Sequence, residues 1–257
     1  MKKILLILIV FCSMQSIFAQ RHELGISLGG ANAIGDVGKG NYINPFPTKL
    51  SKDGSYYFPV SIGALYRFNF NPYMGLRANF SYSRVGASDH LSGEQYKRDR
   101  NLNFTNNIVE GAVLFEYNFT DINENQKSAN APYIFFGVGL SSFKNRYYDI
   151  NDEETILYKK SERESKVVLP FGVGYKVKFN YNWVISLETG FRYTGSDGLD
   201  YNNPRFTDKL LQAGALNPEI QEKIDSKVYG NLSNKDWYVI TGLTLTYTFG
   251  RPACYCN

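Results

Sequence analysis

The feature that most constrains the fold is a period-two alternation of apolar and polar residues that recurs along the chain. In the last such segment, 237–249, one set of alternate positions runs from Trp237 to Phe249 and is largely apolar, while the other set is mostly small and polar. The same alternation is found in seven earlier segments, namely 24–28, 58–68, 74–82, 109–119, 134–140, 167–179 and 183–193. Successive side chains of a β-strand point to opposite faces, so the sequence predicts an all-β chain of eight strands. Several are long for strands of a soluble protein.

The connections between these segments alternate in length. Long polar segments are expected at about 33–55, 86–101, 144–165 and 195–235, and shorter ones at 69–73, 120–131 and 180–182. An even strand number, with short turns on one side and long loops on the other, is typical of a transmembrane β-barrel. We therefore expect an eight-stranded antiparallel barrel of the OmpA/OmpX kind, with long extracellular loops and both termini on the periplasmic side.

The N-terminal segment has the pattern of a secretory signal peptide. Lys2 and Lys3 precede an apolar run at 4–11, and small and polar residues lead to Ala19. A membrane anchor would need a longer apolar run, and Phe11 is unsuitable before a lipidated Cys12. We expect a signal peptide at 1–19, an outer-membrane barrel at 20–249 and a periplasmic tail at 250–257.

Charge and composition narrow the class of protein further. Loss of Lys2 and Lys3 would take the net charge from +4 to +2, and no basic cluster indicates a nucleic-acid surface. The 20 Tyr and 18 Phe residues occur without any apolar run of 18 residues after position 19, as expected where apolar residues are spread over alternating strands. Aromatic residues at strand ends match the interfacial girdles of membrane proteins.

The polar face of the expected strands carries charges of both signs. The interior of an eight-stranded barrel is filled by side chains, and buried charges need partners. We expect a lumen network in which Arg77 and Arg192 pair with Glu110, Glu116 or Glu188. Its full membership is Arg67, Arg77, Glu110, Glu116, Lys176, Glu188 and Arg192, with Glu23 and Lys178 on the same face. The alternative is a secreted β-sandwich or lipocalin-like barrel, in which the polar face would meet water.

Few motifs indicate chemistry. Ser88, Asp89 and His90 are the residue types of a hydrolase triad, but sequence neighbours rarely adopt triad geometry, so we interpret them as loop residues. The segments 137–139 and 172–174 lack the Lys-Ser/Thr of a phosphate loop and are interpreted as glycines opposite bulky lumen side chains. Asp36, within 35–40, could bind a cation, although a turn with positive φ is the favoured interpretation.

The last connection and the C-terminal end of the chain carry further signals. Thr207 and Asn217-Pro218 resemble helix starts, with Ile220 and Ile224 on one face. They predict that the fourth loop is partly helical and forms a short cap over the barrel mouth.

Phe249 is a strand-terminal aromatic of the kind that outer-membrane proteins present to their insertion machinery. A metal site at Cys254 and Cys256 would lack a second ligand pair, and a disulfide across one residue would be strained.

The chain resembles the PorG family, the outer-membrane barrels of the Bacteroidetes type IX secretion system. The resemblance rests on segments that follow one another in order: 29–36 (GGANAIGD), 100–104 (RNLNF), 170–174 (PFGVG), 189–194 (TGFRYT) and, as its most specific part, 236–256. It implies a non-enzymatic component of a machine for protein export and gliding motility, without a cofactor. It also implies association with periplasmic ring proteins of the PorK and PorN kind, and it places Arg251, Cys254, Tyr255 and Cys256 on a periplasmic tail where contact with the ring is possible.

Other functions are kept as alternatives. A general small barrel would act as an adhesin or an envelope-stabilising protein through its long loops. A lipid-modifying barrel enzyme would need a nucleophile and a base, and the chain has only two His residues. An open pore is disfavoured because eight strands leave no open lumen.

Overall fold

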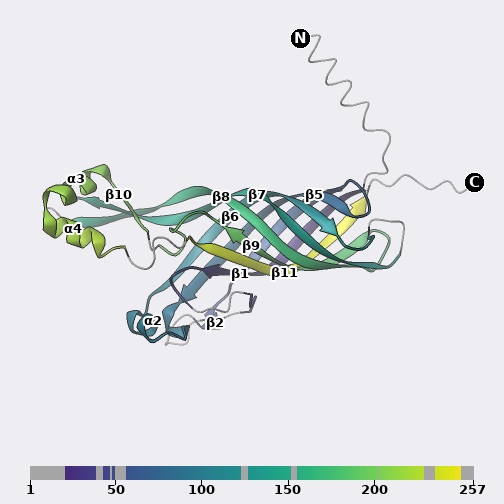
Figure 1. Cartoon of the computed structure of the whole chain (residues 1–257), viewed down its shortest axis with the longest axis horizontal. Coiled ribbons are helices and arrows are strands. Elements are labelled where there is room, and N and C mark those ends of the chain that lie inside the picture. The colour runs from purple at the N-terminus through teal and green to yellow at the C-terminus, as the bar shows by residue number, and fades with distance from the viewer. Residues whose placement is uncertain are drawn as a thin grey trace, which may run out of the picture.

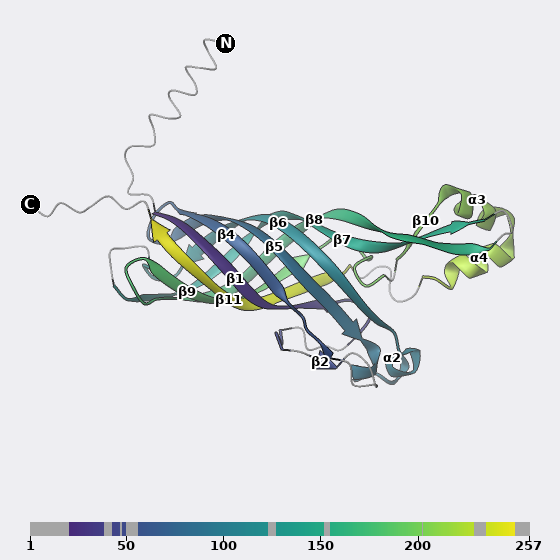
Figure 2. The same cartoon turned by 180° about the vertical axis from the view of Figure 1, so that it is seen from behind.

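In the computed structural model, eight long strands close into a single antiparallel ring (Figures 1 and 2). The structure describes residues 21–38, 43–46, 48–49, 56–122, 127–151, 155–201, 203–228 and 235–249. The ring strands are β1 (Arg21–Ile34), β4 (Ser61–Asn69), β5 (Met74–Ser88), β6 (Asn103–Asn118), β7 (Ala129–Ile150), β8 (Ile156–Lys178), β9 (Trp183–Tyr193) and β11 (Trp237–Phe249). Each pairs with the next in this order, and β11 pairs with β1 to close the ring, with His22 opposite Phe249. The predicted eight-stranded barrel is confirmed.

The outward face of the ring is apolar. Ile26, Phe80 and Leu140 are 66%, 62% and 61% exposed, and large apolar side chains recur at alternate positions of every ring strand. Such a surface is far larger than the apolar patches that soluble monomers expose. Closure leaves no unpaired sheet edge within the band, as a protein in lipid requires. The alternation therefore describes a transmembrane barrel rather than a secreted sandwich.

The upper part of the last strand departs from this pattern. Val239 belongs to the apolar set of β11, yet it is fully buried. The neighbouring strand β1 contacts the first loop on the same face. A Cβ added to Gly30 of β1 would lie 2.5 Å from the Cα of Pro45 in the loop, and Asn32 Nδ2 of β1 donates to the carbonyl of Asn44 at 2.6 Å. The first loop thus covers part of the outward face on the loop side.

The loops differ from the turns in content as well as length. The first loop contains a two-stranded sheet, β2 (Thr48–Lys49) with β3 (Tyr56–Tyr57), and the second contains the short helices η2 (Asp89–Leu91) and α2 (Gln95–Arg100). On the opposite side, the β4–β5 turn is held by Asn71, whose Oδ1 accepts from the N–H groups of Tyr73 and Met74 at 2.8 Å each.

The polar segment 144–165, expected as a long loop, consists largely of paired strand residues. β7 and β8 continue as a paired hairpin through Ile150 and Ile156, with a register shift between Asn145 and Tyr147. The hairpin extends well beyond the ring and forms an arm (Figure 1). The apolar alternation does not extend over the arm, because the outward positions change from apolar to polar where the arm leaves the barrel.

The fourth loop is partly helical, as predicted. Thr207 caps α3 (Asp208–Leu216) by accepting from Leu210 N–H at 3.2 Å, and Asn217 caps α4 (Pro218–Asp225) by accepting from Glu219 N–H at 3.0 Å. The predicted position over the barrel mouth is wrong, however. Both helices lie at the far end of the arm, where β10 (Arg205–Phe206) pairs with β7 in parallel (Figures 1 and 2).

The helices sit at the arm tip because it offers them an apolar surface. Leu210, Ile220 and Ile224 are buried with Ile150 of β7 in one cluster. Tyr148 and Phe206 pack against this cluster and stack with ring centroids 6.0 Å apart. Among the residues that the structure describes, no helix is long and apolar enough to cross a membrane.

We predict that this arm-tip cluster can be loosened without harm to the barrel. Ile220→Ala with Ile224→Ala removes buried methyl and methylene groups, at a cost of about 2–5 kcal/mol for each substitution. Limited proteolysis should then cleave the helices faster, while the unboiled protein keeps its heat-modifiable migration in gels. Leu216→Ala is the matched control, because Leu216 is 87% exposed. Loss of the heat-modifiable form in the double variant would show that the arm tip and the barrel fold as one unit.

Candidate functional site: a charged lumen closed on the loop side

The lumen of the barrel holds nine buried charged side chains. None of them is more than 8% exposed, and together they are Glu23, Arg67, Arg77, Glu110, Glu116, Lys176, Lys178, Glu188 and Arg192. They alternate with the outward apolar residues along β1, β4, β5, β6, β8 and β9. All seven residues of the expected lumen network lie inside the ring, and the structure joins them into two groups.

Glu116 is the centre of the larger group. Its carboxylate meets Arg67 Nε at 2.8 Å, Arg77 Nη1 at 2.9 Å and Lys176 Nζ at 2.6 Å. Arg67 and Arg77 lie directly opposite each other in the β4–β5 register. Like charges in that relation repel, so the carboxylate between them is what allows both guanidinium groups to stay in the interior.

Two further carboxylates complete this group. Glu188 Oε2 lies 2.7 Å from Arg77 Nη1 and accepts from the Tyr133 hydroxyl at 2.6 Å. Glu23 pairs with Arg67 and accepts from Asn69 Nδ2 at 2.7 Å. Three carboxylates therefore face three cations, Arg67, Arg77 and Lys176, in one connected network.

The smaller group lies nearer the loops. Arg192 Nε is 3.5 Å from Glu110 Oε2, which also accepts from the Tyr238 hydroxyl. Arg192 Nη1 donates to the carbonyl of Gly190 at 2.5 Å. Arg192 is thus held by its own strand as well as by Glu110.

Two aromatic side chains inside the lumen were not predicted from the sequence. Tyr133 and Phe135 of β7 are 1% and 2% exposed, and Lys176 Nζ and the Arg77 guanidinium lie 4.4 and 5.0 Å from their respective ring centroids. The signal was available at 172–174. A Cβ at Gly172 would lie 2.6 Å from Phe135 Cζ, and one at Gly174 would overlap the Tyr133 ring. These two glycines do lie opposite bulky lumen side chains, as interpreted.

An apolar layer closes the lumen on the loop side. Val85, Phe104, Ile108, Phe143 and Val168 point inward from β5 to β8 and form one buried cluster with Tyr238 and with Leu199 of the fourth loop. Leu199 is fully buried. The first segment of the fourth loop, and not its helices, therefore closes the barrel mouth.

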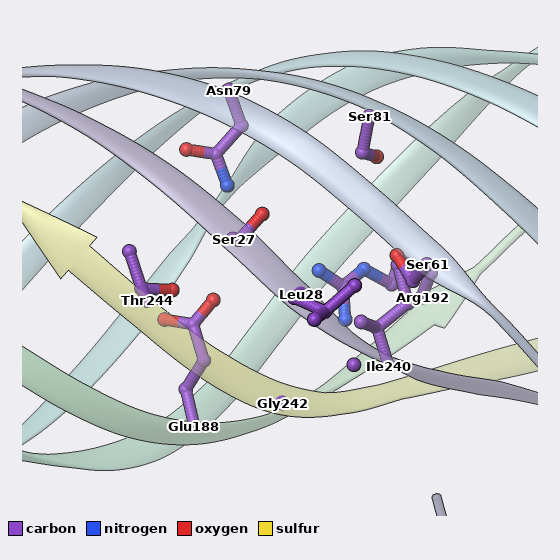
Figure 3. A pocket seen from close by; sticks show the side chains of 11 residues that line it. Ser27, Leu28, Ser61, Asn79, Ser81, Glu188, Arg192, Ile240, Gly242 and Thr244 are labelled. Atoms are coloured by element: carbon purple, nitrogen blue, oxygen red, sulfur yellow. The ribbon is translucent and has the colours of Figure 1, made fainter.

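The space left in the middle of the lumen is small. A cavity there has a volume of about 20 Å³. Its lining includes Asn79, Ser81, Glu188, Arg192 and Thr244, which are drawn in Figure 3. That volume suits about one water molecule. The buried charged and aromatic side chains named above occupy the interior on either side of this cavity.

Three aspartates lie against this closure. Asp236 Oδ2 accepts from Leu199 N–H at 2.9 Å, and Asp200 Oδ2 accepts from Asp36 N–H at 3.2 Å. Burial, then the charge of Asp200, raises the pKa of the Asp236 carboxyl above its ordinary value. Burial raises the pKa of the Asp197 carboxyl to about 6, and the negative charges of Asp200 and Asp36 add to this effect. The turn that carries Leu199 is therefore held by Asp236, whose carboxyl resists ionisation.

Other candidates from the sequence have structural roles. The Asp89 carboxylate is fully buried and accepts from Arg100 Nε at 2.8 Å and Gly38 N–H at 2.9 Å, so it joins the first and second loops rather than orienting His90. Gly38 supplies the positive φ expected in the 35–40 turn, at 104°.

Metal binding and the C-terminal tail are the remaining candidates from the sequence. Among the described residues, no group of three or more His, Cys, Asp or Glu side chains is arranged to hold a metal ion. Arg251, Cys254, Tyr255 and Cys256 lie outside the residues that the structure describes, as do the expected signal peptide at 1–19 and the tail at 250–257.

The sequence matches a known protein family. Residues 2–257 match the family described as a domain of unknown function, DUF6089. The chain belongs to this family. No curated protein matches the sequence.

Among solved structures, the chain is similar to small outer-membrane barrels. It shares 14% identity with the attachment invasion locus protein Ail of Yersinia pestis, over 90% of this chain and 100% of that one, with a TM-score of 0.43. The N-terminal β-barrel domain of Pseudomonas aeruginosa OprF shares 11% identity over 90% and 98% of the two chains, with a TM-score of 0.42. The Neisserial surface protein NspA shares 10% identity over 90% and 98%, with a TM-score of 0.41. The barrel of this DUF6089 chain is established by its own strand pairing.

We predict that Glu116 is the most costly of the lumen charges to remove. Glu116→Gln leaves Arg67, Arg77 and Lys176 with two carboxylates in place of three, and an uncompensated buried charge costs on the order of 3–5 kcal/mol. The midpoint of guanidinium unfolding in detergent micelles should fall clearly. Arg192→Leu should cost less, because its ion pair is longer at 3.5 Å.

The control for this prediction is Glu162→Gln, which removes an exposed carboxylate of the arm. Its unfolding midpoint should equal that of the parent. If Glu116→Gln also leaves the midpoint unchanged, the lumen charges are solvated and do not form a network that supports the barrel.

We predict that the closure of the mouth weakens as pH rises. A carboxyl with a raised pKa in the folded state contributes stability that is complete below the ordinary aspartate pKa of about 3.9 and is lost as pH rises through the raised pKa. The thermal midpoint of the parent should therefore fall between pH 5 and pH 8. Asp236→Asn, which can still accept from Leu199 N–H, should show a smaller fall, whereas Asp208→Asn at the exposed start of α3 should behave as the parent. Equal pH dependence in all three proteins would contradict this account.

Proposed function

We propose that this chain is an outer-membrane barrel that acts through its surfaces and is not an enzyme or an open channel. The observation that carries the proposal is the filled interior. Glu116 and its three cations occupy the lumen, the apolar cluster around Leu199 lies above them, and the cavity between has about 20 Å³. Solute passage would require removal of packed charges and side chains, so what the protein does is done by its loops, its arm and its periplasmic side.

Within that class, we infer a role in type IX protein secretion and gliding. The resemblance to the PorG family supports this inference and implies association with ring proteins of the PorK and PorN kind. β1 begins and β11 ends on the short-turn side, where His22 and Phe249 are paired. A tail that continues from Phe249 would start there. In this proposal both termini are periplasmic, and Arg251, Cys254, Tyr255 and Cys256 are the candidate contacts with the ring.

One observation favours a second function. The β7–β8 arm projects far on the loop side and carries helices with their own buried cluster, so a defined surface stands away from the barrel. An adhesin or envelope-stabilising barrel would use such a surface. In that case the arm, and not the tail, would carry the binding activity.

The two functions can be separated by affinity capture. An affinity tag in the loop 151–155 would allow the protein to be recovered from detergent-solubilised outer membranes under mild conditions. Recovery of ring proteins supports the secretion role, and their absence with export intact favours the general barrel. Fractionation with outer membranes and heat-modifiable migration test the barrel itself, and recovery as a soluble periplasmic or secreted protein would end this proposal.

We predict a division of roles between the last strand and the tail. Deletion of Arg251 to Asn257 should leave the amount of assembled barrel nearly unchanged but weaken ring recovery and export. Phe249→Asp should instead lower the amount of assembled barrel, because it places a charge at the end of the lipid-facing strand. Cys254→Ser with Cys256→Ser should have only a mild effect.

The outcomes of the deletion are distinct. If it removes the barrel itself, the tail belongs to assembly. If ring recovery and export are untouched, the tail is not the contact, and the periplasmic turns at 70–73 and 179–182 become the next segments to test.

A further inference from the structure

The outward surface of strands β5 to β8 changes from apolar to basic over two steps of the ladder. One row of paired positions is Phe80, Gly111, Leu140 and Val167, and the next is Tyr82, Val109, Ser142 and Ser165. Above these, Arg84 lies opposite Asn107, and Lys144 lies opposite Arg163. We call Arg84, Lys144 and Arg163 the basic row. All three side chains are exposed.

The backbone that carries the basic row is fixed by hydrogen bonds. Asn106 of β6 points inward and is buried, and its amide binds the backbone of Lys144 from both sides. Asn106 Nδ2 donates to the Lys144 carbonyl at 2.7 Å, and Asn106 Oδ1 accepts from Lys144 N–H at 3.1 Å. Arg163 Nη1 donates to the Ser142 carbonyl of the paired strand at 3.3 Å. The cations are thus presented by paired strands rather than by a loose loop.

The charge pattern of this surface is unbalanced. Lys144 and Arg163 are direct cross-strand neighbours, a relation in which like charges repel. Inside the barrel the same relation between Arg67 and Arg77 is offset by Glu116. Outside, within the part of the chain that the structure describes, neither Lys144 nor Arg163 forms an ion pair with a carboxylate, whereas Lys159 higher on β8 pairs with Asp149 at 3.0 Å.

What lies around the pair suits an anion with an apolar body. The hydroxyls of Ser142 and Ser165 lie one step below Lys144 and Arg163, and they can donate hydrogen bonds. One step further down, Leu140 and Val167 are 61% and 58% exposed on the lipid-facing band. Arginine and lysine are the residues that bind phosphate most readily. A ligand with phosphate at the upper level and acyl chains at the lower level would meet both surfaces at once.

We propose that the basic row binds the phosphate groups of a phosphorylated lipid in the outer leaflet, with Lys144, Arg163, Ser142 and Ser165 around one phosphate. The proposal rests on the outer-membrane placement made above, which puts this row at the level of the headgroups. The lipid provides the negative charge that Lys144 and Arg163 lack, and its chains cover Leu140 and Val167. The barrel is thereby held at a fixed depth on the side of its arm.

The test uses the purified barrel in a neutral detergent with lipid A as the probe, and native mass spectrometry measures the fraction of protein that retains the lipid. Lipid A should bind at least tenfold more tightly than its dephosphorylated form. Lys144→Gln with Arg163→Gln should remove most of this difference, while Arg163→Lys, which keeps the charge, should preserve binding within a few fold. Lys159→Gln, which removes a cation of the same strand that already pairs with Asp149, is the control and should bind as the parent does.

Each other outcome overturns the proposal. Equal binding of the two lipid forms excludes phosphate recognition, and unchanged binding by the double variant places recognition elsewhere. Displacement of lipid A by inorganic phosphate at the same concentration would assign the row to free anions rather than to lipid. Heat-modifiable migration of each variant confirms that the barrel is folded. Because binding is measured in detergent, failure here is distinguishable from failure of the outer-membrane placement, which is measured by fractionation.

Discussion

The constraint on which the rest of this structure depends is closure of eight strands into one ring. Closure pairs every strand edge, so the backbone can sit in lipid, but it also encloses an interior that only side chains can fill. Every second residue must therefore suit a narrow, water-poor space. The long stems of Arg67, Arg77 and Lys176 and the rings of Tyr133 and Phe135 fill it, and Gly172 and Gly174 leave room for those rings.

Filling a membrane barrel with charges is stable only where the charges meet. Buried ions lose their hydration, and the loss is recovered only through close partners and hydrogen bonds. Glu116 makes the arrangement possible because one carboxylate touches cations from β4, β5 and β8. The network therefore links strands that are not all neighbours in the ring. Its effect is to fix the barrel shape from within, while lipid contacts outside are non-directional.

Much of this architecture could be predicted from the sequence, and the failures have physical reasons. Alternation defined the ring strands because lipid outside and a polar lumen inside make the two faces differ. Thr207 and Asn217 marked helix starts because capping is local chemistry. The arm was not predicted because its strands lie beyond the lipid-facing band that ends near Leu140 and Val167. The alternation of apolar and polar residues therefore stops there, although the strand pairing continues. The site of the helices could not be predicted, since it depends on Ile150 meeting Ile220 and Ile224 across a long sequence distance. Tyr133 and Phe135 were overlooked because aromatic residues inside the lumen look like a continuation of the lipid face.

The division of the molecule into layers limits what it can do. From the turn side upward, an ionic network, a small cavity and an apolar cluster under Leu199 follow one another, and Asp236 holds the closing turn. Within the described residues, the packed side chains of these layers lie across the interior of the ring. The outside, in contrast, is varied: an apolar band, a basic row where the band ends on β5 to β8, and an arm with its own core. A barrel with a filled interior and with distinct outer surfaces is suited to hold a fixed depth and orientation in the membrane while other molecules bind to either end of it.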